Sequence, residues 1–246
     1  MFSVRILSIT LFIGLAHTIV FGQVILPDTL FVKSTVDKAK QAYTQSTKNY
    51  SHLFNGKEYI EFKKNMQQVG TPFFNSEDWE EGYVFYDDEL YEKVPLHYDL
   101  LTEKLVVEHL AHGGIELINE KIKFFGIAGH NFVRLEDQAN NKRYFGFYDV
   151  IYNGTTTKVF VKRWKVTEEK VETQLSSTIT FKEKKSIILL KNGVYNQVGN
   201  KSSALKVFGD QKSALKKYIS KNKIRYRTNR EEALVKIARQ YDQLTH

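Results

Sequence analysis

Four residues combine side-chain types and spacings that a metal site could use. His97 and Asp99 occupy alternate positions of an expected strand, which places them on one face, while His109 and His112 lie at a turn. Imidazole and carboxylate groups are common zinc ligands in hydrolases. These spacings match no fixed ligand pattern, and a histidine on a half-buried strand is more often an ordinary packed side chain. The pattern therefore allows a metal-dependent hydrolase without requiring one.

The sequence contains no motif for other kinds of catalysis. The chain has no cysteine, which excludes thiol catalysis and disulfides. It also contains no Gly-x-Ser-x-Gly elbow, no phosphate-binding glycine loop and no dinucleotide fingerprint. Adjacent acids such as Glu80-Glu81 and Asp87-Asp88 fall in turn-like contexts typical of solvated loops. We therefore expect no catalytic motif and no cofactor.

The charge distribution is the most informative feature of the composition. Residues 201–246 hold 12 Lys and Arg against 4 acids, a net charge of +8, whereas the remainder without Arg5 holds 23 against 24. Two interpretations stay open: the solvated faces of amphipathic helices, or a surface that binds an acidic envelope polymer, lipid headgroups or an acidic protein. The expected basic surface consists of Lys216, Lys217, Lys221, Lys223, Arg225, Arg227 and Arg230.

The first 22 residues have the layout of a signal peptide. A positive charge at Arg5 precedes the mostly apolar run from Ile6 to Phe21, and the small residues Val20 and Gly22 suit cleavage before Gln23. We expect an exported protein that lies in the periplasm or is associated with the outer membrane. Such a protein seldom meets nucleic acid, and no later stretch is apolar enough for an integral membrane protein.

The expected fold class is α+β, with an antiparallel β meander over residues 81–199 that forms a curved sheet or an open barrel. Short runs rich in Val, Ile, Phe and Tyr alternate there with turn residues. The expected strands are Tyr83–Tyr86, Pro95–Leu100, Lys104–His109, Ile122–Ile127, Asn131–Leu135, Arg143–Ile151, Lys158–Val166, Thr178–Lys182 and Ile187–Leu190.

Helices are expected on both sides of this β body. Within residues 23–80, Ser34 and Asp37 resemble a capping box that opens a helix to about Tyr50. In residues 200–246, apolar spacings of three and four predict about three short helices. Gly209 suits a left-handed helix end and Asp210 an N-cap.

Aromatic residues occupy both alternating faces of the stretch from Tyr144 to Tyr152. This arrangement is typical of a curved sheet that packs on two sides. It would also suit a groove that stacks on sugars or carries an apolar ligand. The sequence does not choose between these alternatives.

Several segments resemble those of exported, uncharacterised proteins common in Bacteroidota. They are Gly82–Asp87, Val94–Leu100, Gly129–Leu135, Lys212–Asn222 and Arg230–Arg239. The resemblance implies an envelope location and a β-rich body with a basic helical tail. It implies no reaction and no catalytic residue. We therefore expect a non-enzymatic envelope protein that binds an acidic partner, with an envelope hydrolase or an apolar-ligand carrier as alternatives.

Overall fold

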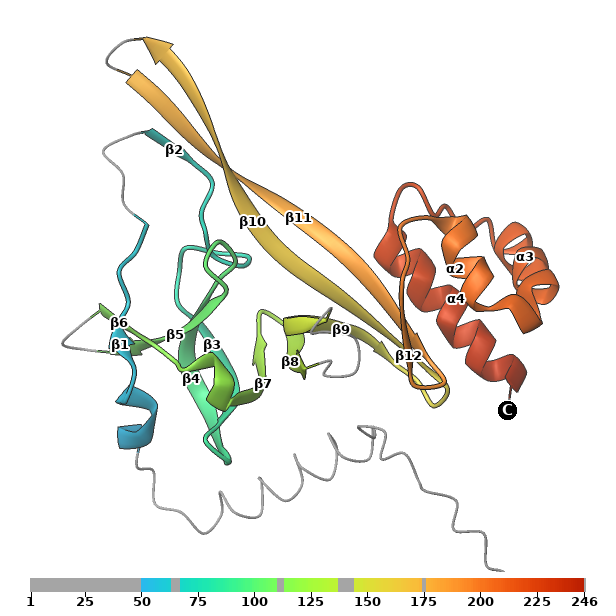
Figure 1. Cartoon of the computed structure of the whole chain (residues 1–246), viewed down its shortest axis with the longest axis horizontal. Coiled ribbons are helices and arrows are strands. Elements are labelled where there is room, and N and C mark those ends of the chain that lie inside the picture. The colour runs from blue at the N-terminus through green and yellow to red at the C-terminus, as the bar shows by residue number, and fades with distance from the viewer. Residues whose placement is uncertain (1–49, 63–66, 110–112, 137–143, 174–175, 246) are drawn as a thin grey trace, which may run out of the picture.

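A computed structural model describes residues 50–62, 67–109, 113–136, 144–173 and 176–245 of the chain. The described part forms one open twelve-stranded sheet, in which eleven strands follow the order β1-β6-β5-β4-β3-β7-β8-β9-β10-β11-β12 with antiparallel neighbours and β2 pairs with β11 (Figure 1). The expected β-rich antiparallel body is therefore confirmed, as an open sheet. The strands are β1 (Lys57–Glu58), β2 (Gln67–Val69), β3 (Glu80–Tyr86), β4 (Glu89–Asp99), β5 (Lys104–His109), β6 (Gly113–Glu116), β7 (Ile122–Ile127), β8 (His130–Glu136), β9 (Phe145–Asn153), β10 (Thr157–Thr173), β11 (Ser176–Lys191) and β12 (Val194–Gln197).

Tight turns connect several of these strands through residues with positive φ. Asp87 and Asp88 turn β3 into β4 with φ of 51° and 67°, and Asn192 and Gly193 turn β11 into β12 with φ of 51° and 75°. Two consecutive positive φ values are what a type I′ hairpin turn requires, and Asp, Asn and Gly tolerate them best. The turn at Asp87 and Asp88 was expected from the sequence.

The strands β10 and β11 form one long hairpin that projects beyond the rest of the sheet (Figure 1). The prediction of two separate strands, Thr178–Lys182 and Ile187–Leu190, is wrong, because pairing with β10 runs continuously through the charged residues between them. These residues are exposed on a strand that extends past its neighbours, and Lys185 pairs with Glu231. Strand β2 braces the distal half by parallel pairing with Thr178–Thr180.

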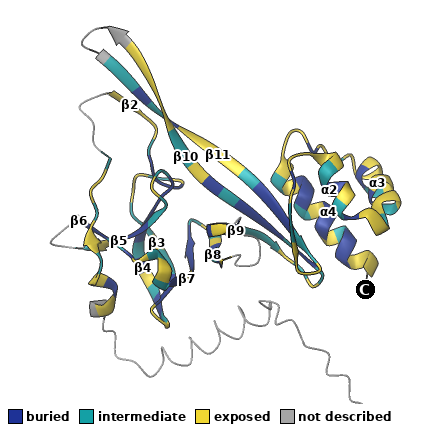
Figure 2. Cartoon of the chain, in the orientation of Figure 1, coloured by how far each residue is buried: buried dark blue, intermediate teal, exposed yellow. Residues whose placement is uncertain are grey.

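The sheet has a separate core at each end. One, the sheet core, is rich in aromatic residues: Tyr98 lies 5.0 Å from Phe125, 5.1 Å from Phe132 and 6.0 Å from Phe147 between ring centroids. The other, the helix core, forms where Val161 and Leu189 of the hairpin meet the C-terminal helices. In Figure 2 these helices are buried toward the sheet and exposed on their outer faces.

Three C-terminal α-helices are present, as expected: α2 (Lys201–Val207), α3 (Lys212–Lys221) and α4 (Arg230–Thr245). Side-chain caps fix where two of them begin. Asn200 and Ser203 form a capping box at α2, and the side chain of Asn229 accepts a hydrogen bond from the backbone of Glu232 at α4 (3.1 Å).

The predicted roles of Gly209 and Asp210 are wrong. Gly209 does not have a positive φ, and it begins a 3-10 turn, η3 (Gly209–Gln211), which leads directly into α3. Asp210 accepts hydrogen bonds from Lys191 and Tyr241 instead of capping a helix. The signal peptide expected over residues 1–22 and the helix expected after Ser34 lie outside the described residues.

A buried carboxylate fastens the C-terminal end of α4 to the sheet. Asp242 is only 6% exposed and accepts hydrogen bonds from the hydroxyls of Tyr152 (3.0 Å) and Thr157 (2.9 Å). The approach is close, since a β-carbon added to Gly154 would lie 1.9 Å from a carboxylate oxygen of Asp242. Helix α4 is thus tied to the start of the hairpin.

We expect Asp242→Ala to lower the free energy of unfolding by about 1–3 kcal/mol, because two donors lose their acceptor. Urea denaturation measures this change. The matched control is Glu232→Ala on the same helix, which removes only exposed contacts with Lys236 and with the side chain of Asn229 and should leave stability nearly unchanged. Equal effects of the two substitutions would contradict the anchoring role of Asp242.

Candidate anion-binding surface

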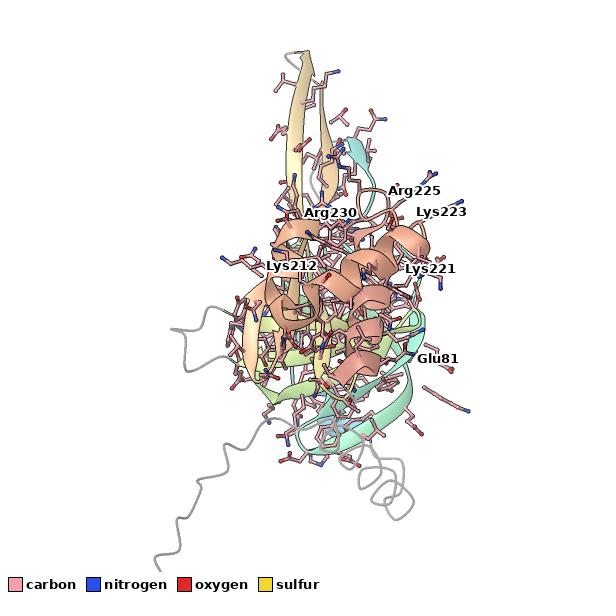
Figure 3. All side chains as sticks on the ribbon, turned by 90° about the vertical axis from the view of Figure 1, so that its right-hand side faces the viewer. Glu81, Lys212, Lys221, Lys223, Arg225 and Arg230 are labelled. Atoms are coloured by element: carbon pink, nitrogen blue, oxygen red, sulfur yellow. The ribbon has the colours of Figure 1, made fainter. Side chains whose placement is uncertain are left out.

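All seven residues of the expected basic surface are exposed. Lys216 and Lys217 lie on the outer side of α3, while Leu215 and Ile219 of the same helix are buried in the helix core. Figure 3 looks onto this end of the molecule and labels several basic side chains that point outward from it: Lys212, Lys221, Lys223, Arg225 and Arg230.

The connection between α3 and α4 presents its cations by a simple alternation. Tyr226 is buried and Ile224 is partly buried against the helix core, whereas Lys223, Arg225 and Arg227 are exposed. Two apolar side chains therefore fasten the connection, and the basic side chains between and beside them face solvent. The result is a row of cations on a fixed backbone.

Each of the four acids in residues 201–246 is occupied elsewhere. Asp210 pairs with Lys191 at 2.6 Å, Glu232 pairs with Lys236 at 2.5 Å, and Asp242 is buried against the hairpin. The hydrogen bond from Lys191 lowers the pKa of Asp210. The fourth acid, Glu231, turns inward to the sheet. Among the described residues, none of the seven basic side chains has an ion pair.

Glu231 belongs to a buried charge network that joins α4 to the sheet. The guanidinium of Arg163, a residue 4% exposed, donates through Nε (2.9 Å) and Nη2 (2.6 Å) to Asp149, which is 1% exposed. The same guanidinium bonds both carboxylate oxygens of Glu231, at 3.1 and 2.7 Å. His130 Nδ1 lies 2.8 Å from Asp149, and Lys185 lies 3.1 Å from Glu231.

The network favours the charged forms of Glu231 and Arg163. Burial by itself would raise the pKa of Glu231, but hydrogen bonds and charge from Arg163 and Lys185 outweigh it and lower that pKa. Burial likewise opposes the charge of Arg163, and its two carboxylate partners raise its pKa. An arginine shared by two carboxylates is thus the main polar link between β9, β10 and α4.

None of the residues of this network was expected to form a site, although the sequence carries a sign of it. Arg163 falls on the same strand parity as the buried Val159 and Val161. Asp242 lies one turn beyond the buried Ala238 on α4. A charge at a position whose pattern demands an apolar residue indicates a buried partner.

The structure places two of the proposed metal ligands in packing roles. His97 is stacked between Trp79 (3.8 Å) and Phe73 (4.1 Å), and burial lowers its pKa. Asp99 accepts hydrogen bonds from the Tyr59 hydroxyl (2.9 Å) and from the backbone and side chain of Thr102 (3.1 and 2.6 Å), which shapes the turn after β4.

His109, a third proposed ligand, has a packing contact of its own. His109 packs edge-on against Phe54 at 4.8 Å, and His112 lies outside the described residues. Within the described ranges, no group of three or more His, Asp or Glu side chains is arranged to hold a metal ion. The arrangement gives His97 and Asp99 a structural explanation that needs no metal.

The part of the chain before residue 201 is nearly neutral in total, but it includes a strongly acidic stretch. Residues 50–100 contain 4 lysines and 11 acids, a net charge of −7. Their strands β1, β3 and β4 lie at one end of the long axis of the molecule and the basic helices at the other (Figure 1). The fold therefore separates opposite charges along its length. This feature could have been counted from the sequence by dividing the body into shorter stretches.

No helix in the described part of the chain has the length and apolar character to cross a membrane. Comparison with protein-family models, with curated proteins and with solved structures gives no match. The resemblance to exported Bacteroidota proteins accordingly stays a prediction.

We expect Arg163→Met to lower the free energy of unfolding by about 3–5 kcal/mol, because it leaves the buried Asp149 and the half-buried Glu231 without the guanidinium that they share. Urea denaturation again provides the measurement. Arg225→Met, which removes an exposed arginine, is the control and should shift stability by less than about 0.5 kcal/mol. A loss below about 1 kcal/mol in Arg163→Met would show that the network does not hold the helix.

The lowered pKa of Glu231 also predicts a pH dependence. Its stabilising contribution is complete above the ordinary value of 4.5 and is lost as the pH falls through the lower pKa of the folded state. The urea midpoint should therefore fall between about pH 5 and pH 3, and Glu231→Gln should flatten that fall. Glu81→Gln, an exposed control, should leave the slope unchanged. Identical slopes in the Glu231→Gln variant and the unmodified protein would contradict the assignment.

Proposed function

We propose that this protein is an exported, non-enzymatic component of a bacterial envelope that binds an acidic partner or surface through its basic helical end. The observation that carries the proposal is the set of seven exposed cations with no ion pair among the described residues. An acidic partner would supply the negative charges that these seven cations do not find among the described residues.

The way the fold distributes its acids supports this proposal. Clustered like charges repel one another and oppose folding, so a segment with only a solvation role needs no such excess. Here Glu231 and Asp242 turn toward the sheet and fasten α4, and the cations of α3 and of the connection are left outside. The helices are thus held by their acids and present their bases.

The expected signal peptide supports an envelope location, in the periplasm or at the outer membrane. The hydrolase alternative has less support, because His97 and Asp99 are engaged in stacking and in a turn. The carrier alternative also has less support, since Tyr148 and Phe160 pack with Ile188 into a cluster on the sheet. Neither alternative gains a specific observation from the described residues.

We expect the combined substitution of Lys216, Lys217, Arg225 and Arg227 by glutamine to reduce association with the envelope fraction by about tenfold or more at low salt. Fractionation of cells that express tagged protein measures this loss. The matched control replaces Lys57, Lys93, Lys182 and Lys184, which removes the same charge from exposed positions of the sheet. Unchanged association of the first variant at low salt would refute the proposal.

A further inference from the structure

The basic end, residues 201–245, exposes few apolar or aromatic side chains beside its cations. From Lys201 onward, the one exposed large hydrophobic side chain among the described residues is Leu244, near the end of α4. The aromatic residues of this segment are buried or half-buried, including Tyr218 and Tyr226. The surface around the seven cations is therefore polar and charged, without an apolar centre or an exposed ring.

This composition distinguishes among acidic partners. A stable protein interface needs a desolvated centre of aromatic and aliphatic side chains, and single-stranded nucleic acids and many sugars need exposed rings for stacking. Lipid headgroups require neither, because a dense layer of negative charge attracts a cationic surface on its own. Resting on the proposed function, we infer that the partner is an anionic membrane surface bound through its lipid headgroups.

The separation of charge gives this contact a direction. The seven cations lie at one end of the molecule, and the acidic strands β1, β3 and β4 lie at the other (Figure 1). An anionic surface attracts the first end and repels the second, most strongly at low ionic strength, where the Debye length reaches about 30 Å. The protein consequently docks on its helices, with the acidic end of the sheet held away from the lipid.

Vesicle sedimentation tests the inference with the exported form that begins at Gln23, because the apolar run Ile6–Phe21 would itself bind lipid. We expect binding to vesicles of phosphatidylglycerol and phosphatidylethanolamine, little binding to phosphatidylcholine vesicles, and release by about 0.5 M salt. Binding that is equal on both kinds of vesicle, or insensitive to salt, would overturn the inference.

A soluble polyanion separates this inference from the proposed function. Polyphosphate should compete with the anionic vesicles for the same cations. If the protein binds polyphosphate but not the vesicles, the membrane inference is overturned and the proposed function stands. If it binds neither, both are overturned.

Substitution of Lys216, Lys217, Arg225 and Arg227 by glutamine should weaken vesicle partitioning by about six hundredfold, since each of the four basic residues near an anionic surface contributes about fivefold. The control with Lys57, Lys93, Lys182 and Lys184 replaced should bind as the unmodified protein does. Equal binding of the two variants would overturn the assignment of the surface.

Orientation can be measured directly, because the chain has no native cysteine to compete for a label. A fluorophore on Ser220→Cys, an exposed position of α3, should be quenched by lipids that carry a quencher on their headgroups. The same fluorophore on Glu81→Cys, at the acidic end, should not be quenched. Quenching at both positions or only at the second would contradict docking through the helices.

Discussion

The arrangement of the molecule depends on one guanidinium. Arg163 is almost fully buried and is shared between Asp149 of β9 and Glu231 of α4. Removing charges from water is unfavourable, so such a group is retained only where its partners are held in good geometry. The arginine therefore sets where α4 meets the sheet, which apolar packing alone would specify less sharply. The position of the cations on α3 and on the connection between α3 and α4 therefore depends on that contact.

Local patterns predicted most of the elements, because the cause of each lies within a few residues. The strands β5 and β7 begin and end where alternation and turn residues placed them, and the three helices follow from apolar spacings of three and four. Lys93 shows the limit: its φ of 57° places a bulge within β4, yet lysine gives no sign of one. Contacts between residues far apart in the sequence could not be predicted from local patterns. Arg163 and Glu231 are 68 positions apart, and their contact can be inferred only once the order of the strands is known.

The same limit applies to the candidate site. The seven cations could be listed from the sequence because charge and solvent exposure go together on amphipathic helices. Whether they were neutralised could not be deduced, because that depends on where Asp210, Glu231 and Asp242 point. Each of these acids turns to a partner in the sheet or hairpin. A net charge alone does not show this division between inward acids and outward bases.

The long hairpin gives the molecule a mechanical property. Helix α4 is fastened to β10 at Arg163 and at Thr157, and β2 holds the far half of β11 through Thr178–Thr180. A force along the hairpin axis, applied at the helices and resisted at β2, acts parallel to the strands. The hydrogen bonds of the ladder then share the load in shear and do not open one at a time. The two strands would therefore behave as a stiff strut between the basic end and the body of the sheet.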